Sequence, residues 1–440
     1  MSKMKDSGIE WIGMIPEEWE ITRVKYLAQD TDSIFIDGDW IESDIIVESG
    51  VRYLTTGNVG AGYFKEQGSG YITEETFKKL NCLKVLPGDL MISRLNEPIG
   101  RACIVPDTEE KYVVAVDNVI LRPDDNYNKK YLMYCMNTDG YANAGKEAAR
   151  GATMQRVSRT LLGGFYVPVA SKEEQQLIAE FLDDKVGKID EILVDLNNQV
   201  EILSKYKKSV ITQAVTKGLN PDVAMKDSGI EQIGLLPKEW DIKPIKYLCT
   251  MQPVVNKKGL RNEDLVSFLP MDHVKNGYFI NDESLLENNN SSYTEFNNGD
   301  IIMAKVTPCF ENGNIAIVDN LYNGFGFGSS ELFVFRANNE VCNKNYLFYW
   351  LQNDHFIKTA TVNMTGAAGL KRVPAYFISH YCVAVPSLKE QQEISDYLDD
   401  KCAKIDELIK DKQTQIEKME KYKKSLIYEY VTGKKRVKGV

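Results

Sequence analysis

Apolar residues recur at seven-residue intervals in two long stretches, one in the middle of the chain and one near its end, where Lys412 interrupts the series once. A second apolar series is interleaved with the first in each stretch, which is the narrow a/d stripe of a coiled coil. The expected seam positions are Leu182, Ile189, Leu196 and Leu203 in the first stretch, and Leu398, Ile405, Met419 and Leu426 in the second. Each stretch suits a helix of about 40 residues, or about 60 Å.

Both helices begin with a capping signal. Ser171 is followed by Glu174, and Ser387 by Glu390, at the spacing of a capping box. We predict long helices at 171–218 and 387–434 that pair with each other. A helix lying on its own domain is the alternative, which the narrow stripe disfavours.

Outside these helices the pattern changes to short β-branched runs broken by Gly, Pro, Asn and Asp. Examples are "DLMISRL" and "YVVAVDNVILRP" in the first half and "DIIMAKVTP" and "ELFVFRA" in the second. Each half also contains one aromatic helical patch, "KKYLMYCMNTDGY" and "NKNYLFYWLQNDHF". The spacing in the first patch predicts a buried helix face rather than a stacking platform. The predicted class is α+β.

The two halves repeat each other at their ends and differ in between. Residues 4–27, "MKDSGIEWIGMIPEEWEITRVKYL", match 225–248, "MKDSGIEQIGLLPKEWDIKPIKYL", with about two-thirds of the positions identical. The helical stretches match as well, whereas residues 28–166 and 249–384 share only scraps. Such a long period indicates a duplicated domain rather than a solenoid.

The expected organisation is a tandem pseudo-repeat of two β-rich domains and two long helices. Its segments are a first domain with its repeated N-terminal segment at 1–170, a first helix at 171–218, a second domain with its repeated segment at 219–386, a second helix at 387–434 and a basic tail at 435–440.

Composition narrows the class of protein. No apolar run approaches the roughly 20 residues of a membrane-spanning helix, and the N-terminus lacks the apolar region of a signal peptide. The eight scattered cysteines, without a CxxC pair, predict reduced thiols in a cytoplasm, and three distant histidines offer little to a metal centre. The net charge of −10 argues against unaided nucleic-acid binding, unless a local patch or partner subunits supply the positive field.

Catalytic signatures are missing from the sequence. It contains no GxxxxGK[ST] phosphate loop, no GxSxG elbow and no HExxH pair. The segment "GFGFGSS" at 324–330 superficially resembles a nucleotide-binding loop, but its context predicts a turn between strands. We therefore expect no catalytic activity from the chain by itself.

Cationic and amide side chains gather in loop segments at corresponding places of the two halves. Arg and Gln can make bidentate contacts with guanine and adenine edges, whereas Lys and Thr mostly hold phosphates. A solvated surface charge is the alternative for any one of these residues, but their recurrence predicts a ligand surface. The candidate DNA-binding residues are Arg94, Asn96, Arg101, Arg150, Gln155, Arg156, Lys305, Thr307, Asn314, Lys371 and Arg372.

The repeated segments and these loops together resemble one family. The segments "SGIEWIGMIPEEWEITRVKYL", "VPVASKEEQQLIAEFLDDKVGKIDEIL" and "GATMQRVS", with "SGIEQIGLLPKEW" and "PSLKEQQEISDYLDDKCAKIDEL" in the second half, resemble the specificity subunit of type I restriction–modification systems. The resemblance covers essentially the whole chain. It departs from a strict repeat at "GAAGLKRVP", the counterpart of "GATMQRVS", which has no residue equivalent to Gln155.

The resemblance implies two target-recognition domains separated by an antiparallel coiled coil that sets the gap between two half-sites. It implies double-stranded DNA with an asymmetric bipartite sequence as the ligand. It also implies two modification (methyltransferase) subunits and restriction or translocase subunits as partners. S-adenosylmethionine, ATP and magnesium would then be bound by those partners, with no cofactor or metal in this chain.

Two other classes of protein stay open. A non-catalytic scaffold with two β-rich domains on a coiled-coil spacer, binding proteins or glycans, would not be retained by DNA even with methyltransferase subunits present. An enzyme with its site in the variable domains is the second alternative, and the missing nucleophile, metal and nucleotide motifs argue against it.

Overall fold

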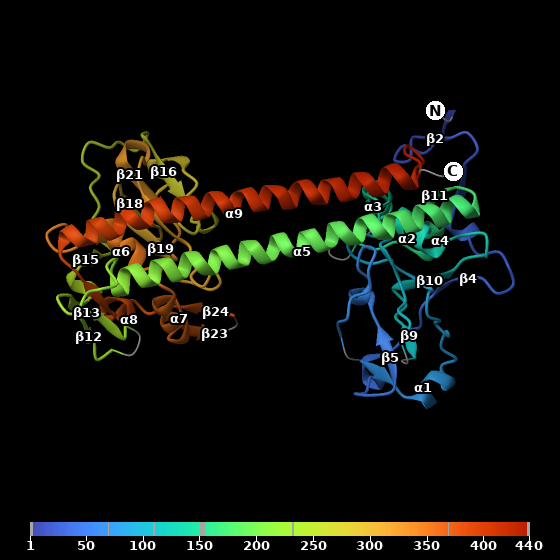
Figure 1. Ribbon diagram of the computed structural model, residues 1–440, viewed down its shortest axis with the longest axis horizontal. Coiled ribbons are helices and arrows are strands. Elements are labelled where there is room, and N and C mark those ends of the chain that lie inside the picture. Colours follow the sequence, from blue (N-terminus) through green and yellow to red (C-terminus); the bar gives the residue numbers. More distant parts are fainter. Residues whose placement is uncertain are drawn as a thin grey trace. The chain divides into compact units, whose positions relative to one another are not determined.

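The computed structural model describes residues 3–68, 70–108, 111–149, 155–230, 233–367 and 369–437. The chain divides into two compact units: the first joins Met1–Leu196 to Thr414–Val440, and the second is Asn197–Gln413. The two predicted long helices are confirmed as α5 (Lys172–Lys217) and α9 (Leu388–Val431), and each contributes one part to each unit (Figure 1).

The first unit contains two principal sheets that share a hydrophobic cluster. The larger sheet is antiparallel, with the order β4-β10-β7-β8, and the smaller has the order β6-β5-β9 with β5 and β9 parallel. Leu54 and Val114 of the smaller sheet pack with Met91 and Ile120 of the larger one. The strands are β4 (Ile34–Asp37), β5 (Val51–Leu54), β6 (Tyr71–Ile72), β7 (Leu90–Ser93), β8 (Ala102–Ile104), β9 (Tyr112–Val114) and β10 (Asn118–Arg122).

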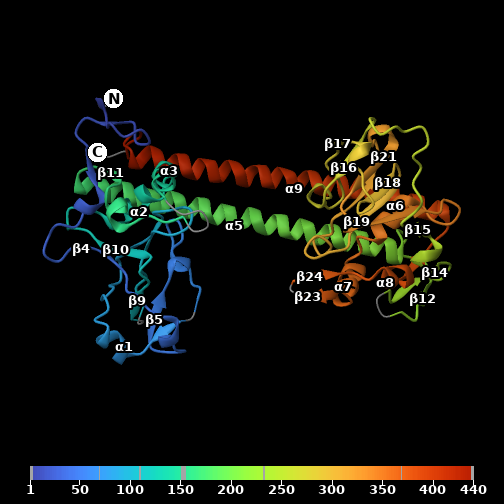
Figure 2. The ribbon, with the colours of Figure 1, turned by 180° about the vertical axis from the view of Figure 1, so that it is seen from behind.

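The second unit repeats this plan with one strand added (Figure 2). Its sheets have the orders β15-β22-β19-β20 and β17-β16-β21-β18, and β16 and β21 form the parallel pair. The β-rich character predicted for both variable regions is therefore confirmed. The strands are β15 (Cys249–Met251), β16 (Leu265–Leu269), β17 (Asp282–Leu285), β18 (Thr294–Asn297), β19 (Asp300–Ala304), β20 (Ile315–Val318), β21 (Phe325–Gly328) and β22 (Leu332–Ala337).

Short strand pairs and helices complete each unit. The paired strands are β1 (Met4–Asp6) with β2 (Met14–Pro16), β3 (Glu20–Arg23) with β11 (Tyr166–Val169), β12 (Met225–Asp227) with β13 (Leu235–Pro237), β14 (Asp241–Pro244) with β25 (Cys382–Val385), and β23 (Thr365–Ala367) with β24 (Leu370–Arg372). The helices are α1 (Glu74–Lys79), α2 (Lys129–Met136), α3 (Asp139–Ala148), α4 (Arg159–Gly163), α6 (Lys344–Trp350), α7 (Asp354–Val362) and α8 (Ala375–His380).

The predicted buried helix face is confirmed in α2, and α6 has the same role in the second unit. Tyr131, Leu132 and Cys135 are fully buried, and Tyr134 is 6% exposed. The hydroxyl of Tyr131 lies 3.0 Å from the carbonyl oxygen of Val431 at the end of α9. In the second unit, the hydroxyl of Tyr346 on α6 lies 3.1 Å from the carbonyl oxygen of Val215 near the end of α5. Each core tyrosine thus fixes the end of one long helix.

The repeated segments form internal contacts that are the same in both units. Trp19 Nε1 donates to Glu174 Oε2 at 2.9 Å, and Trp240 Nε1 donates to Glu390 Oε2 at 3.0 Å. Ser171 Oγ accepts from the backbone N–H of Glu174, which is half of the predicted capping box. The carboxylate that should complete the box binds tryptophan instead. Much of the sequence repeat is therefore explained by the folding of each unit.

The two long helices pack antiparallel within each unit. In the first unit, Phe181 of α5 contacts Tyr430 of α9, and Asp190 pairs with Lys423 at 2.5 Å. In the second unit, Lys207 Nζ lies 2.7 Å from the Asp406 carboxylate, and Gly218, which directly follows α5, lies beside Glu390 of α9. The coiled-coil expectation is thus confirmed within each unit. Six seam residues are buried, Leu182, Ile189, Leu196, Leu398, Ile405 and Leu426, and Leu203 and Met419 are half-buried.

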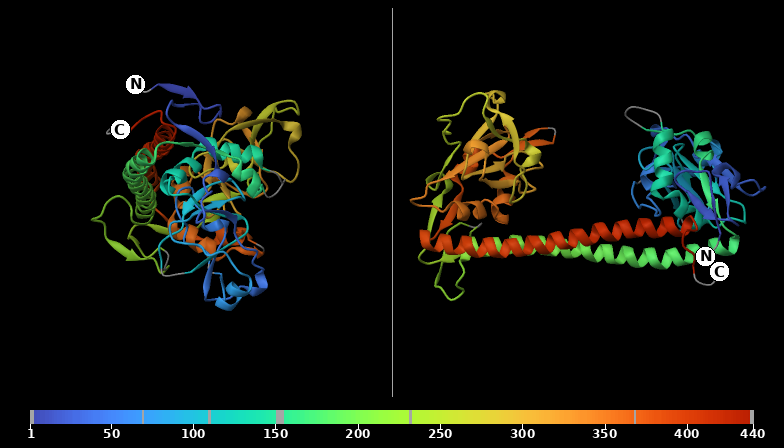
Figure 3. Two further views of the ribbon diagram at one scale, coloured as in Figure 1. Left: turned by 90° about the vertical axis from the view of Figure 1, so that its right-hand side faces the viewer. Right: turned by 90° about the horizontal axis from the view of Figure 1, so that it is seen from above.

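The segment after α9 contacts the first repeated segment within the first unit (Figure 3). Lys434 Nζ donates to the carbonyl of Ile12 at 2.6 Å, and Arg436 pairs with Glu18 and Glu174. The expected basic tail therefore supplies specific contacts that tie the end of α9 to the first repeated segment.

The turn predicted at "GFGFGSS" is wrong, because residues 325–328 form strand β21 in the middle of a sheet. Phe325 and Phe327 point into the core and are at most 1% exposed. A side chain at Gly326 would collide with the Phe296 ring, and one at Gly328 with the Leu269 carbonyl. Close packing in the sheet requires these glycines, so here they do not indicate a turn.

Candidate nucleic-acid interface

The predicted loop segments come together at the same place in each unit, at the end of a central strand. In the first unit the loop after β7 forms an antiparallel bridge between Leu95 and Arg156. In the second unit the loop after β19 forms the equivalent bridge between Val306 and Arg372. Segments separated by about 60 residues in each half therefore form one surface, as their recurrence predicts.

An acidic residue holds the exposed arginine of each surface. The N–H of Arg94 donates to the carbonyl of Asp117 at 2.9 Å, and the carboxylate of Asp117 lies 3.5 Å from Arg156. The second unit has the same arrangement, in which Glu331 binds Arg372 through two hydrogen bonds of 2.8 Å. These hydrogen bonds lower the pKa of the Glu331 carboxyl. Neither acid is among the residues predicted from the sequence, although each directly precedes a strand, β10 or β22.

Arg94 is buried, with 4% of its surface exposed. Its guanidinium donates to the Val157 carbonyl at 3.1 Å and to the Val116 carbonyl, and lies 3.2 Å from the Asp37 carboxylate. Burial lowers the pKa of Arg94, which the charge of Asp37 partly offsets. The side chain joins three loop segments beneath the surface, so these contacts favour a structural role, and its contact with DNA stays a prediction.

Arg101 organises the same loop from within. Its guanidinium donates to five backbone carbonyls, at distances from 2.8 to 3.2 Å, and burial lowers its pKa. The accepting residues are Thr56, Val59, Leu95, Asn96 and Pro98. Asn96 is exposed at the tip of the loop, and its φ of 58° is a left-handed conformation that Asn tolerates. Arg101 thus shapes the loop, and Asn96 is presented to the outside.

The other first-unit candidates differ in accessibility. Gln155 is half-buried, and its carbonyl accepts from the N–H of Asn96 at 3.0 Å. The side chain of Arg156 is 52% exposed, so a ligand can reach it although it pairs with Asp117. Arg150 lies outside the described residues. Asn96 and Arg156 are therefore the candidates best placed for DNA.

The second-unit candidates gather around the β23–β24 hairpin. Thr307 Oγ1 donates to the Gly369 carbonyl at 2.8 Å and accepts from the N–H of Lys371 at 3.0 Å. Lys371 is exposed, and the side chain of Arg372 is 45% exposed. Lys305 is half-buried, with its ammonium 5.5 Å from the centre of the Phe333 ring. Asn314 is half-buried at the end of the same loop.

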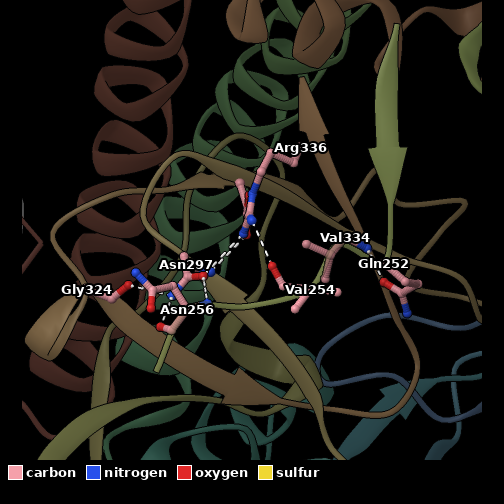
Figure 4. Close-up of polar contacts among 8 residues, drawn as sticks. Gln252, Val254, Asn256, Asn297, Gly324, Val334 and Arg336 are labelled. Atoms are coloured by element: carbon pink, nitrogen blue, oxygen red, sulfur yellow. Dashed lines mark hydrogen bonds and ion pairs between the residues drawn. The ribbon is translucent and has the colours of Figure 1, made fainter. Parts of the chain in front are cut away.

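At the opposite end of each central sheet, a partly exposed arginine pairs with a buried carboxylate. Arg336 binds the fully buried carboxylate of Asp300 through two hydrogen bonds of 2.7 Å, and it donates to the Val254 carbonyl at 3.0 Å (Figure 4). Arg122 binds Asp89 in the same way at 2.9 and 2.8 Å. The sequence signal that was missed is a "GD" pair at the start of one strand together with an "R" near the end of the strand beside it in the sheet. These pairs make each sheet a firm base for the loops.

Among the described residues, no group of three or more His, Cys, Asp or Glu side chains is placed to hold a metal ion. Within the same part of the chain, no helix has the length and apolar character needed to cross a membrane.

Comparisons with known proteins agree with this arrangement. Residues 16–202 and 237–418 match the family described as type I restriction modification DNA specificity domain. The specificity subunit of the Escherichia coli type I restriction enzyme EcoAI is 33% identical over 177 residues, which are 40% of this chain and 29% of that protein. The putative MjaX specificity subunit of Methanocaldococcus jannaschii is 26% identical over 451 residues, covering 97% of this chain and 96% of that protein.

A solved structure shares the fold. It is described as the structural basis of complex assembly and conformational transition of the type I R-M system. It aligns with a TM-score of 0.68 at 11% sequence identity, and covers 95% of this chain and 98% of its own.

Proposed function

The chain belongs to the family of type I restriction–modification DNA specificity domains, and from this membership we propose that it reads an asymmetric DNA target in two halves, one through each unit. The observation that carries the proposal is the interface itself. Both units present cationic and amide side chains from the same two segments, on the same sheet end, with different residues. Two units with the same fold but different residues at the interface suit two half-sites of different sequence.

The chemistry of the interface supports contact with DNA rather than catalysis. The exposed groups are guanidinium, ammonium and amide groups, which donate to base edges and phosphates. Specificity subunits are non-catalytic parts of methyltransferase and restriction complexes, so the reaction belongs to other subunits. We propose that S-adenosylmethionine, ATP and magnesium bind to those subunits, and that the complex acts in the cytoplasm.

Repeated exposed apolar residues support docking of two copies of one methyltransferase subunit. Tyr26 and Tyr247 occupy the same place in the two repeated segments and are 44% and 62% exposed. Ile192 of α5 and Leu408 of α9 are also equivalent in sequence and are 45% and 49% exposed. The contacts within each unit do not explain why these positions stay apolar. Restriction or translocase subunits would join the same assembly.

The experiment that tests the function is single-molecule sequencing of DNA methylation in host cells with the gene intact and with it deleted. A split, asymmetric adenine-methylation motif that disappears on deletion is the expected result. Purification of the tagged chain should then recover a methyltransferase subunit. A chain that recovers no such subunit, and is not retained by DNA, would be a protein- or glycan-binding scaffold instead.

A further inference from the structure

A short hairpin is retained in the variable regions of both units. Its sequence is Val-x-x-Gly-Tyr-Phe, at residues 59–64 and 274–279. The N–H of Gly60 donates to the carbonyl of Tyr63 at 2.9 Å, and the N–H of Lys275 donates to the carbonyl of Tyr278 at 2.9 Å. The bridges Val59–Phe64 and Val274–Phe279 complete the equivalence. Two regions that otherwise share only scraps of sequence thus contain the same local structure.

The fold accounts for every retained residue of the hairpin except the tyrosine. Both valines are fully buried. The glycines have a φ of +89° in each unit, a conformation that other residues seldom adopt, and the phenylalanines pack on the cores. Tyr63 and Tyr278, however, are 59% and 60% exposed. Among the described residues, neither phenol hydroxyl has a hydrogen-bond partner. A surface role common to both halves is the remaining reason to retain them.

The hairpin is fastened to the loop that carries the candidate DNA-binding residues. In the first unit, Arg101 Nε donates to the carbonyl of Val59 at 2.8 Å, and the N–H of Gly62 donates to the carbonyl of Ala102 at 3.0 Å. In the second unit, the N–H of Gly277 donates to the carbonyl of Ile315, the residue after Asn314, at 2.9 Å. Each tyrosine therefore has a fixed position beside the recognition loop.

A lysine lies over the ring of Tyr63, and the second hairpin also contains a lysine, at a different position. Lys65 Nζ lies 5.8 Å from the centre of the Tyr63 ring, and Lys275 belongs to the same hairpin as Tyr278. A phenol hydroxyl beside an ammonium group is a donor pair suited to a phosphate oxygen. A phosphate contact carries no sequence information, so it can be identical in two domains that read different bases. These features favour the DNA backbone over a base edge as the ligand.

We propose that Tyr63 and Tyr278 donate hydrogen bonds to phosphates of the DNA backbone and hold each recognition loop in register with its half-site. The proposal rests on the proposed function, since it presumes that the two units bind DNA. It adds a sequence-independent contact to the loop residues already considered. Tyr278 also borders a hollow of about 500 Å³ against α5, so a segment of a partner protein is the competing occupant.

The test compares Tyr63→Phe, Tyr278→Phe and the double variant with the wild-type chain in the assembled methyltransferase complex. The probes are a duplex containing the methylated motif and a scrambled duplex of equal length. The matched control is Tyr206→Phe with Tyr422→Phe, a repeated pair on α5 and α9 with 53% and 54% exposure. We expect each hairpin substitution to weaken binding about tenfold on both duplexes, because the lost hydrogen bond is to a charged oxygen. The control should bind as wild type.

Salt dependence gives a second readout. Lys65→Ala and Lys275→Ala should each reduce the slope of log affinity against log salt by about one, whereas the Tyr→Phe variants should keep the wild-type slope. Weakened binding of the cognate duplex alone would show base reading and overturn the proposal. Loss of subunit assembly would show protein docking and also overturn it, as would unchanged affinity. If the wild-type complex bound neither duplex, the proposed function itself would be wrong.

Discussion

Arg94 and Arg156, which the sequence presents as equals, occupy opposite environments in the first unit. Arg94 is 4% exposed and bound on several sides, while the side chain of Arg156 is 52% exposed. Arginine is rarely buried, so the sequence predicts exposure for both. The acceptors of Arg94 come from segments far away in the chain, Val116 and Val157, and no local pattern reveals them.

We expect Arg94→Ala to lower the free energy of unfolding by about 3 kcal/mol, because it removes the ion pair with Asp37 and leaves two carbonyls without their donor. Arg156→Ala should change it by less than about 0.5 kcal/mol. The exposed substitution should instead weaken DNA binding by about 1–3 kcal/mol. Urea denaturation and DNA binding of both variants check this. Wild-type stability in the Arg94 variant would contradict its role in the fold.

The Glu331–Arg372 pair leads to a second prediction at this scale. Glu331 occupies the Nε/Nη2 edge of Arg372 through two hydrogen bonds, so that edge is available to DNA only when the pair opens. Glu331→Gln should therefore tighten binding to any duplex by about fivefold, the worth of an exposed pair, and reduce discrimination. Titration of cognate and scrambled duplexes measures both effects. Weaker binding would mean that Glu331 positions Arg372 productively instead.

The pH dependence of this pair follows from its pKa. Arg372 lowers the pKa of Glu331 below its ordinary value of 4.5. An acid whose pKa is lower in the folded state than in the unfolded state stabilises the fold at any pH above its unfolded-state pKa. This stabilisation is lost as the pH falls through its folded-state pKa. The pair is therefore intact at neutral pH, and Glu331→Gln should abolish only the part of the acid sensitivity that arises below about pH 4.5.

At the scale of elements, the sequence predicts the long helices and their bounds, but not all of the side-chain contacts at their N-terminal ends. The seven-residue repeat predicts α5 and α9, and short β-branched runs predict most strands of the two central sheets. The capping-box pattern is half right, because the carboxylates of Glu174 and Glu390 bind tryptophans from another segment. Long-range partners of this kind, like those of β21, depend on tertiary packing, which a local pattern does not encode.

These tryptophan–glutamate contacts yield an element-scale prediction. Burial raises the pKa of Glu390, and the hydrogen bond from Trp240 opposes that shift. Trp240→Phe should therefore raise the pKa further and lower the free energy of unfolding by about 1–3 kcal/mol at neutral pH. Stability should fall as the pH rises above about 4.5, because the folded state then holds a proton that the unfolded state has lost.

Chemical denaturation of Trp240→Phe and wild type between pH 4 and pH 8 measures this difference. The matched variant is Trp19→Phe, which removes the same contact to Glu174 in the first unit. A cost for Trp240→Phe that stayed constant across this range would show that packing of the indole, and not the carboxylate, determines the effect.

At the scale of the whole chain, the duplicated sequence corresponds to two units that share both long helices. In the second unit the end of α5 continues directly into the repeated segment at 225–248, and Gly218 lies against Trp240. In the first unit the end of α9 approaches the repeated segment at 4–27 from the far end of the chain. In the first unit, non-covalent contacts hold the long helix to the repeated segment, whereas in the second unit the chain itself connects them. The net charge of −10 gives no indication of the basic residues that follow α9.

Removal of residues 432–440 should therefore loosen the first unit alone. The deletion removes Gly433, which lies against Pro16 and Trp19, and the pairing of Arg436 with Glu174 at 3.3 Å. Hydrogen exchange should accelerate at least tenfold in β3 and α2, because local opening then costs less free energy. In β14 and α6, where the equivalent closure is covalent, exchange should be unchanged. Lys435→Ala is the control, since its partner Glu429 belongs to α9 itself and the pair is exposed. Equal acceleration in both units would mean that the tail supports the long helices rather than the first repeated segment.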